Sequence, residues 1–304
     1  MRTFFHTCVL IPEMNIFGLI LISVLFQFQS YSVASETVKN ASTEAVAQPS
    51  IEKVKETCVQ QLSPFKSYFK KTDLNNSCSR ALLLKNCQSV QGTPIFHFDD
   101  KSQSKEKSKN ILVISLIHGD ETQAGALGRY WVERLEKIQP RNNWRIIPVM
   151  NPDGVAAKTR MNANGVDLNR NFPTLDWNEK AIDFWKKEGG SSKRRFPGHN
   201  AASEPEVGCL LSHIEEYQPD FVMSIHTPLR VLDFDGPHVK PPIYNYLPWK
   251  RLGNFPGSLG RYLWVEKSIP VLTTELRNEL PATVAPFEQL QDVIGELVQK
   301  EIKK

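Results

Sequence analysis

The chain has 304 residues, of which 40% are hydrophobic and 23% are charged, and its formal net charge at pH 7 is +4. This length allows one large domain or two small ones, and the composition is typical of a soluble globular protein. The small charge argues against nucleic-acid binding, because the basic stretches Lys101–Lys109 and Lys193–Arg195 lack the interleaved aromatic residues of a nucleic-acid groove.

The N-terminus has the organisation of an export signal. Arg2 precedes the apolar run Ile16–Phe28, and the small-x-small sequence Ser32–Ala34 follows it. The apolar run is shorter than the roughly 20 residues that cross a bilayer. We therefore predict a signal peptide over residues 1–34, cleavage after Ala34, and a secreted, periplasmic protein without stable membrane insertion. The alternative is a protein anchored in the membrane by an uncleaved signal.

Four cysteines remain after the predicted cleavage, and no two of them form a C-x-x-C pair, which argues against a structural zinc site. In an oxidising compartment four thiols can pair in three ways. A bond between Cys78 and Cys87, or between Cys58 and one of these two, would fasten the N-terminal segment. The sequence does not choose between these pairings or place Cys209.

Residues 35–90 are predicted to be a polar linker followed by a small cysteine-bearing extension, with helix-like patterns at Ser63–Lys71 and Ser79–Asn86. Residues 91–304 alternate short apolar runs with helical patterns. The predicted strands are Pro94–Phe98, Ile111–Ile117, Arg145–Val149, Phe221–Ile225 and Pro270–Thr274. The predicted helices are Thr122–Ile138, Glu204–Tyr217, Ser258–Lys267 and Pro286–Ile302. This alternation predicts an α/β fold with three layers, in which helices cover both faces of a mixed, mainly parallel sheet.

Three of the predicted strands run into polar residues that are costly to bury without compensation. One reaches His118 and Glu121, the next reaches His226, and the last reaches Glu275. For the first strand alone, a simple turn at Gly119 would explain the pattern. Ligands of such sheets bind outside the carboxyl ends of the strands, however, and three similar endings favour a site.

Two imidazoles and one carboxylate, with a fourth position left for water, form a catalytic zinc site. Nitrogen and carboxylate ligands suit zinc better than magnesium or calcium. We predict one Zn²⁺ ion held by His118, Glu121 and His226, which leaves Glu275 free to act as a base.

The loop between the first two of these endings carries Arg160, Asn169 and Arg170 in a turn-rich stretch. An arginine presents a planar fork that matches a carboxylate or a developing oxyanion. Surface arginines on a polar loop are the alternative, but the adjacent asparagine and arginine favour a functional role.

The motifs HGDE, NPDG, GVDLNRNFP, SIH and TELRN, in this order and spacing, resemble the zinc carboxypeptidase family over residues 91–304. The motifs ASEPE (Ala202–Glu206) and PGSLG (Pro256–Gly260) are similar to motifs of the murein tripeptide amidases. Those enzymes cut the γ-D-glutamyl–diaminopimelate bond of peptidoglycan peptides. The resemblance implies that His118, Glu121 and His226 bind zinc, and it makes Glu275 the general base. It also implies that Arg160 polarises the scissile carbonyl and that Asn169 and Arg170 bind a substrate carboxylate.

Ordinary carboxypeptidases also place a tyrosine between the last metal ligand and the base. Tyr244, Tyr246 and Tyr262 lie in that interval, but none stands in a matching context. This departure favours the amidase.

We therefore predict a zinc-dependent hydrolase of peptidoglycan-derived peptides. The alternatives are a metallocarboxypeptidase for other C-terminal residues and a zinc deacylase of N-acyl amino acids. A non-enzymatic cell-wall binding module is disfavoured, because such a protein should lack a ligand or the base. Near the third ligand, Asp233 or Asp235 could meet the ammonium group of diaminopimelate or could belong to an acidic turn that faces water. The sequence does not determine the oligomeric state.

Overall fold

The computed structural model of the protein describes residues 49–69, 73–104 and 107–299. The predicted signal peptide and most of the predicted linker lie outside these ranges. Within them, no helix has the length and apolar character needed to cross a membrane.

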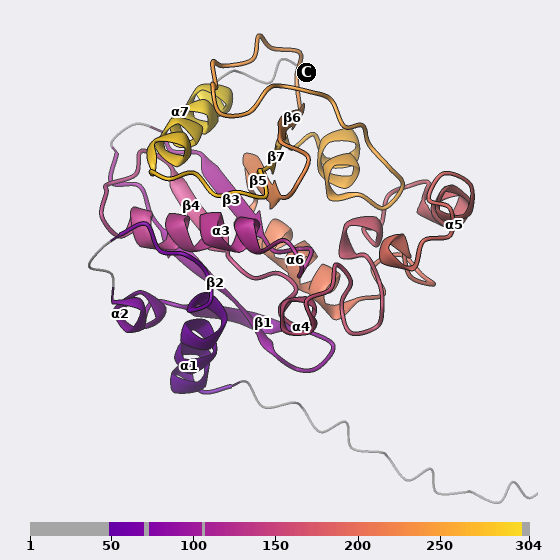
Figure 1. The fold of residues 1–304 in the computed structure, drawn as a ribbon, viewed down its shortest axis with the longest axis horizontal. Coiled ribbons are helices and arrows are strands. Elements are labelled where there is room, and N and C mark those ends of the chain that lie inside the picture. Colours follow the sequence, from indigo (N-terminus) through magenta and orange to yellow (C-terminus); the bar gives the residue numbers. More distant parts are fainter. Residues whose placement is uncertain (1–48, 70–72, 105–106, 300–304) are drawn as a thin grey trace, which may run out of the picture. The chain divides into compact units, whose positions relative to one another are not determined.

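A seven-stranded sheet forms the centre of the described fold, in the order β1-β2-β4-β3-β5-β7-β6 (Figure 1). The four central strands β4, β3, β5 and β7 are parallel, whereas β1, β2 and β6 join antiparallel at the two edges. The predicted α/β class with a mixed sheet is confirmed. The strands are β1 (Leu82–Gln88), β2 (Pro94–Asp100), β3 (Asn110–Ser115), β4 (Asn143–Ile147), β5 (Phe221–His226), β6 (Val231–Asp235) and β7 (Val271–Glu275).

Helices cover both faces of this sheet, and the alternation of side chains along β3 shows why. Ile111 and Val113 pack into one core cluster with α1, α3 and α7, whereas Leu112 and Ile114 pack into a second cluster with α6. A strand that is buried on both faces reads as a continuous apolar run. The helices are α1 (Ile51–Leu62), α2 (Leu74–Cys78), α3 (Thr122–Leu135), α4 (Pro152–Ala157), α5 (Trp177–Lys187), α6 (Pro205–Tyr217), α7 (Ala285–Gln299), the short turns η1 (Leu168–Arg170) and η2 (Lys193–Arg195), and the π-helix η3 (Arg261–Glu266).

The predicted helical pattern at Ser79–Asn86 is wrong, because Leu82–Gln88 is the edge strand β1. Its leucines and lysine favour a helix locally, but hydrogen bonding to β2 decides the conformation. The described part of Ser63–Lys71 is a turn and irregular chain. Strand β6 and helices α4 and α5 were not predicted, and the division of the chain near residue 90 stays a prediction.

Two disulfides select one of the three possible pairings. Cys58–Cys78 joins α1 to α2, and Cys87–Cys209 joins β1 to α6, so the pairing of Cys78 with Cys87 is wrong. The first bond closes a separation of 20 residues, for which loop entropy predicts roughly 3 kcal/mol of stabilisation. Both bonds fasten the N-terminal segment to itself or to the main sheet.

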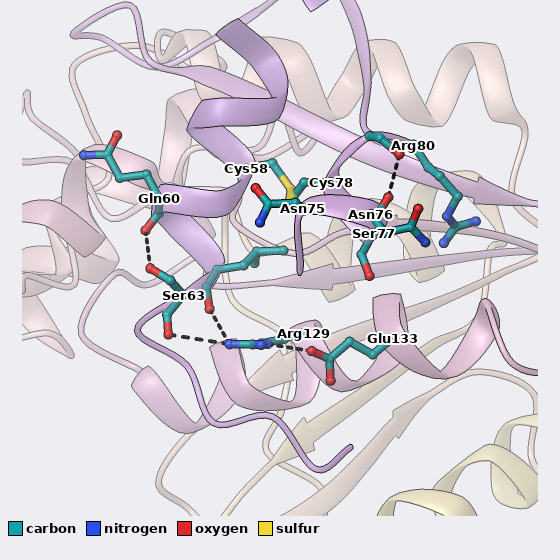
Figure 2. Close-up of a disulfide and its surroundings, with 12 residues drawn as sticks. Cys58, Gln60, Ser63, Asn75, Asn76, Ser77, Cys78, Arg80, Arg129 and Glu133 are labelled. Carbon is teal, nitrogen blue, oxygen red and sulfur yellow. Dashed lines mark hydrogen bonds and ion pairs between the residues drawn. A yellow bond between two sulfur atoms is a disulfide. The ribbon is translucent and has the colours of Figure 1, made fainter. Parts of the chain in front are cut away.

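Arg129 of α3 adds a second attachment for this segment (Figure 2). Its guanidinium donates to the carbonyl oxygens of Leu62 and Phe65 at 3.2 and 2.8 Å, and to Glu133 at 2.8 Å. The chain that follows α1 is therefore held against α3 by a buried, charge-assisted network.

Candidate active site

The carboxyl ends of three neighbouring parallel strands bring the predicted site residues together. His226 at the end of β5 and Glu275 at the end of β7 are direct register partners. Strand β3 ends at Ser115, and His118 follows in the connection to α3, whose N-cap residue is Glu121. Residues that are far apart in the sequence thus meet at one edge of the sheet.

His118, Glu121 and His226 are buried and face one another. His118 Nδ1 lies 2.8 Å from Glu121 Oε1 and 3.1 Å from His226 Nδ1. His226 Nδ1 lies 3.1 Å from Glu121 Oε2. Two ligand atoms on one tetrahedral zinc ion stand roughly 3.3 Å apart, given metal–ligand bonds of about 2.0 Å. The spacing and the donor set therefore fit one zinc ion.

A second group in the described part of the chain, made of Cys87, Cys209 and His213, has similar spacing. Its two sulfur atoms are bonded to each other as a disulfide, so they offer no thiolate. The group around His118 is the one whose ligand atoms remain available to a metal.

The other ring nitrogen of each histidine has its own partner. His118 Nε2 lies 3.0 Å from Asp167 Oδ1, and His226 Nε2 lies 2.9 Å from the Ser224 hydroxyl. Such partners fix the orientation of a ligating imidazole. Neither partner was predicted, although Asp167 belongs to the GVDLNRNFP motif and Ser224 lies two residues before His226, on the same face of β5.

Neighbouring charges shift the pKa values of His118 and Glu121. Burial and the Arg160 guanidinium lower the pKa of His118, but the carboxylates of Glu121 and Asp167 outweigh them and raise it overall. Burial would raise the pKa of Glu121, but the imidazoles of His118 and His226 hold it below its ordinary value. The two imidazoles therefore favour the ionised form of the Glu121 side chain.

The HGDE and NPDG motifs pack directly against each other. A Cβ atom at Gly119 would overlap the backbone of Gly154 and Val155, so only glycine fits there. Asn151 caps α4 by accepting the Gly154 N–H at 2.9 Å. Gly119 is thus explained by close packing, and the predicted turn at this residue coexists with the site.

Arg160, Asn169 and Arg170 line the same cavity as the three ligands. Arg160 Nε donates to Asp167 Oδ2 at 2.9 Å, and its Nη1 lies 3.5 Å from Glu121. Arg170 forms no ion pair with any described residue, and burial followed by the positive charges of Arg160 and Arg195 lowers its pKa despite Asp167. A half-buried arginine that lines a cavity and forms no ion pair with a described residue is suited to bind an anion.

Neighbouring segments hold Asn169 and Arg170 in place. The Leu259 N–H donates to Asn169 Oδ1 at 2.9 Å, which leaves the amide NH₂ group of Asn169 as its donor. A Cβ at Gly257, whose φ is +76°, would overlap the Arg170 carbonyl. The Gly257 N–H also donates to the Thr174 hydroxyl at 3.0 Å, so the PGSLG motif helps to hold the loop of Asn169 and Arg170 in place.

Two acids at the start of α6 hold the same loop from its other side. Asn162 Nδ2 donates to Glu204 Oε2 at 2.6 Å and to Glu206 Oε2 at 3.1 Å. Asn164 also donates to Glu204, at 2.8 Å. These contacts connect the ASEPE motif to the two asparagines that precede the GVDLNRNFP motif.

The cavity that joins these residues has a volume of about 1090 Å³. Glu275 lies in it and accepts the Leu229 N–H at 3.2 Å. Phe184 and Trp185 of α5 and the loop at Phe255 form further walls, and the exposed Arg194 and Arg195 also line it. This volume is slightly above the roughly 300–1,000 Å³ of small-molecule pockets, so the cavity has room for a short peptide.

Comparison with known proteins identifies the family. The model of the zinc carboxypeptidase family (peptidase M14) matches residues 72–236, more than half of the chain. Murein peptide amidase A of Vibrio campbellii is 32% identical over 200 residues, which cover 62% of this chain and 77% of that protein. The chain belongs to the zinc carboxypeptidase family.

Other members of this zinc-dependent family agree with the assignment. Murein peptide amidase A of Escherichia coli K12 is 32% identical, but the match covers only 48% of this chain and 59% of that protein. The crystal structure of murein-tripeptide amidase from E. coli O157 has a TM-score of 0.52 at 24% identity, over 72% of this chain and 92% of that one. Carboxypeptidase A from Helicoverpa armigera has a TM-score of 0.54 at 16% identity, over 82% and 80%. These two structures show the shared fold.

Among the described residues, no tyrosine lines the cavity of this zinc carboxypeptidase-family protein. The Tyr244 hydroxyl donates to the Pro286 carbonyl at 3.1 Å, and that of Tyr246 donates to Glu279 at 3.4 Å. Tyr262 stacks on Phe172, with ring centroids 6.0 Å apart. The three tyrosines between the third ligand and Glu275 are thus engaged elsewhere.

Proposed function

We propose that the protein is a zinc-dependent amidase that cleaves the γ-D-glutamyl–meso-diaminopimelate bond of peptidoglycan-derived peptides. The observation that carries this proposal is the likeness to a murein peptide amidase at 32% identity over 77% of that protein's length. The cavity also supports this proposal, because the three predicted zinc ligands, Glu275 and Arg170 all line it.

One zinc ion would be held by His118 Nδ1, His226 Nδ1 and the Glu121 carboxylate. When bound, zinc supplies a Lewis acid and lowers the pKa of a coordinated water toward about 7. Asp167 and Ser224 would keep the two imidazoles in the orientation that presents their Nδ1 atoms.

Glu275 would accept the proton of the attacking water and deliver it to the departing amine. Its register pairing with His226, one of the three proposed ligands, supports this role. The Leu229 N–H holds one carboxylate oxygen and leaves the other available. General acid–base catalysis of this kind contributes about a hundred- to ten-thousandfold in rate.

Arg160 would stabilise the negative charge that develops on the scissile carbonyl oxygen. Asp167 and Glu121 hold its guanidinium in place before substrate arrives. Loss of one such donor typically costs roughly 3 kcal/mol.

Arg170 and Asn169 would bind a substrate carboxylate next to the scissile amide. Arg170 lacks an acidic partner among the described residues, and the Asn169 oxygen is already engaged. In a tripeptide that ends in diaminopimelate, the free carboxylate next to the scissile amide would fill this position.

A metallocarboxypeptidase that releases other C-terminal residues is the second candidate, and the likeness to carboxypeptidase A supports its fold. The lack of a tyrosine along the described cavity walls favours the amidase.

The proposed compartment is the periplasm, reached through the predicted signal peptide. The two disulfides support an oxidising compartment, because such bonds persist there and are rare in the cytosol.

Digestion of a defined muropeptide panel tests the proposal. The panel holds the tripeptide L-Ala-γ-D-Glu-meso-diaminopimelate, the same tripeptide within an intact disaccharide, α-linked peptides with a free C-terminus, and N-acyl amino acids. We expect product masses that show release of free diaminopimelate, loss of that release on chelation, and its recovery when zinc is added back. Release of ordinary C-terminal residues with the muropeptide intact would assign a carboxypeptidase instead.

A further inference from the structure

Two buried acids of strand β6 lie in the cavity described above and have no role in the mechanism proposed for it. Asp233 and Asp235 line the cavity and expose only 4% and 9% of their surface. The alternative considered from the sequence, an acidic turn that faces water, is therefore wrong.

Neither carboxylate has a counter-ion. No lysine, arginine or histidine in the described part of the chain forms an ion pair with either acid, and Arg251 acts on both only from a longer distance. Asp233 accepts the Leu252 N–H at 3.2 Å. Burial, followed by the charge of Asp233, raises the pKa of Asp235 to about 6. Two buried carboxylates without a cation are costly, and a cationic group in the cavity would relieve that cost.

The sheet register places these acids at a defined distance from the reaction centre. On the neighbouring strands β6 and β7, Val231 is paired with Glu275 and Asp233 is paired with Thr273. Asp233 is therefore offset from Glu275 by two residues along the strand direction. Two residues of a strand span roughly 7 Å. Asp235 lies on the same face, two residues further from Glu275.

A matching substrate group follows from this distance. Three bonds of an extended chain advance roughly 3.6 Å, so a chain of six bonds spans roughly 7 Å. Six bonds separate the two amino nitrogens of diaminopimelate, and six also separate those of lysine. An amino group at that distance from the scissile nitrogen would reach the level of Asp233, and Asp235 lies beyond it on the same face of β6.

We infer that Asp233 and Asp235 form a pocket that binds the side-chain ammonium group of the residue released by hydrolysis. This inference rests on the proposed function and specifies its substrate as a diamino acid. Arg170 and the two acids would then recognise the carboxylate and the ammonium of the same residue, and a neutral side chain would leave both acids unpaired.

Three matched substrates and two variants test the pocket. Each substrate is a γ-D-glutamyl amide, of meso-diaminopimelate, of lysine or of norleucine, which has the length of lysine without its nitrogen. For the wild type we expect kcat/KM to be at least tenfold higher for the two diamino acids than for norleucine. In Asp233→Asn and Asp235→Asn that ratio should fall ten- to a hundredfold. Asp292→Asn, on the exposed face of α7, removes the same charge away from the cavity and should keep the wild-type ratio.

Binding of the free amino acids separates this inference from the proposed function. Calorimetry on zinc-loaded wild type should show tighter binding of diaminopimelate and lysine than of norleucine, and it needs no turnover or variant. If the wild type cleaves none of the three amides but prefers the diamino acids in binding, the proposed function fails and the pocket stands. If the wild type cleaves norleucine amides as fast as the others, or binds all three amino acids equally, the pocket inference is overturned. Thermal midpoint and zinc content show whether each variant is folded, and the wild-type comparison decides the question if a variant is not.

Discussion

Two pairs of buried histidines in this protein have the same spacing and opposite surroundings. The ring centroids of His118 and His226 are 4.8 Å apart, and so are those of His97 and His213. The first pair faces Glu121 and Asp167, and the pKa of His118 is raised.

The second pair faces a guanidinium, which gives it the opposite chemistry. Burial, together with the charge of Arg145, lowers the pKa of His97 to about 4, although Asp99 and Glu216 oppose this shift. Burial, His97 and Arg145 lower that of His213 to about 3. Arg145 in turn is held by two hydrogen bonds of 2.8 Å to Asp99. The comparison teaches that neighbouring charges, not the distance between imidazoles, separate a candidate metal site from a neutral core pair.

The largest expected difference between the pairs is in metal content. His226→Ala should lose the bound zinc and reduce turnover by about ten-thousandfold or more, because it removes one of three ligands. His213→Gln, the matched change in the other pair, should keep one zinc ion per chain. Elemental analysis and turnover of both purified variants test this, and zinc retained by His226→Ala would contradict the ligand assignment.

A smaller loss of turnover should follow from replacing Glu275, the proposed base, which lies beside the first histidine pair. Glu275→Gln should lower kcat by about a hundred- to ten-thousandfold, because the proton acceptor is removed. Its zinc content should match that of the wild type. Steady-state kinetics on a γ-D-glutamyl amide give the result, and wild-type kcat in this variant would show that Glu275 is not the base.

Asp167, beside the first pair, and Asp99, beside the second, should differ in their effect on zinc affinity. Asp167→Asn should weaken zinc binding roughly ten- to a hundredfold, because it disturbs the partner of His118 Nε2. Asp99→Asn, near His97, should leave zinc affinity unchanged. Competition with a chromophoric chelator measures the zinc affinity of both variants. Equal losses of affinity would contradict the assignment of the zinc site to the first pair alone.

The smallest expected effect is a pH dependence of stability from the second pair. The pKa of His97 in the folded protein, about 4, lies below the ordinary histidine value of 6.5 that applies to the unfolded chain. The unfolded chain therefore binds more protons between these values, and stability falls as pH drops through this window. Between pH 6.5 and 5.5 this histidine should remove about 1 kcal/mol from the free energy of unfolding.

Urea unfolding of wild type and His97→Gln at pH 7.5, 6.5 and 5.5 measures this contribution together with the change at the neighbouring His213, because groups distant from His97 cancel in the difference. A constant difference between the two proteins across these pH values would mean that folding does not lower the pKa of His97.

The order of the motifs and the apolar runs of the strands were readable from the sequence. Continuous apolar character over Ile111–Ile117 predicts a strand that is buried on both faces, and the polar residues after β3, β5 and β7 predict a site at their carboxyl ends. The buried strand is confirmed, and the polar residues do meet at one edge of the sheet, because both inferences depend on local composition and on the general geometry of parallel sheets.

Only the tertiary structure decided which of these groups meet and which lack partners. Asp167 reaches His118 across a loop, Asp233 faces the cavity because β6 pairs antiparallel with β7, and Leu82–Gln88 is a strand because β2 lies beside it. The pairing of Cys87 with Cys209 spans 122 residues. Long-range contacts of this kind leave no local pattern, since their energies depend on neighbours that the folded chain brings together from distant parts of the sequence.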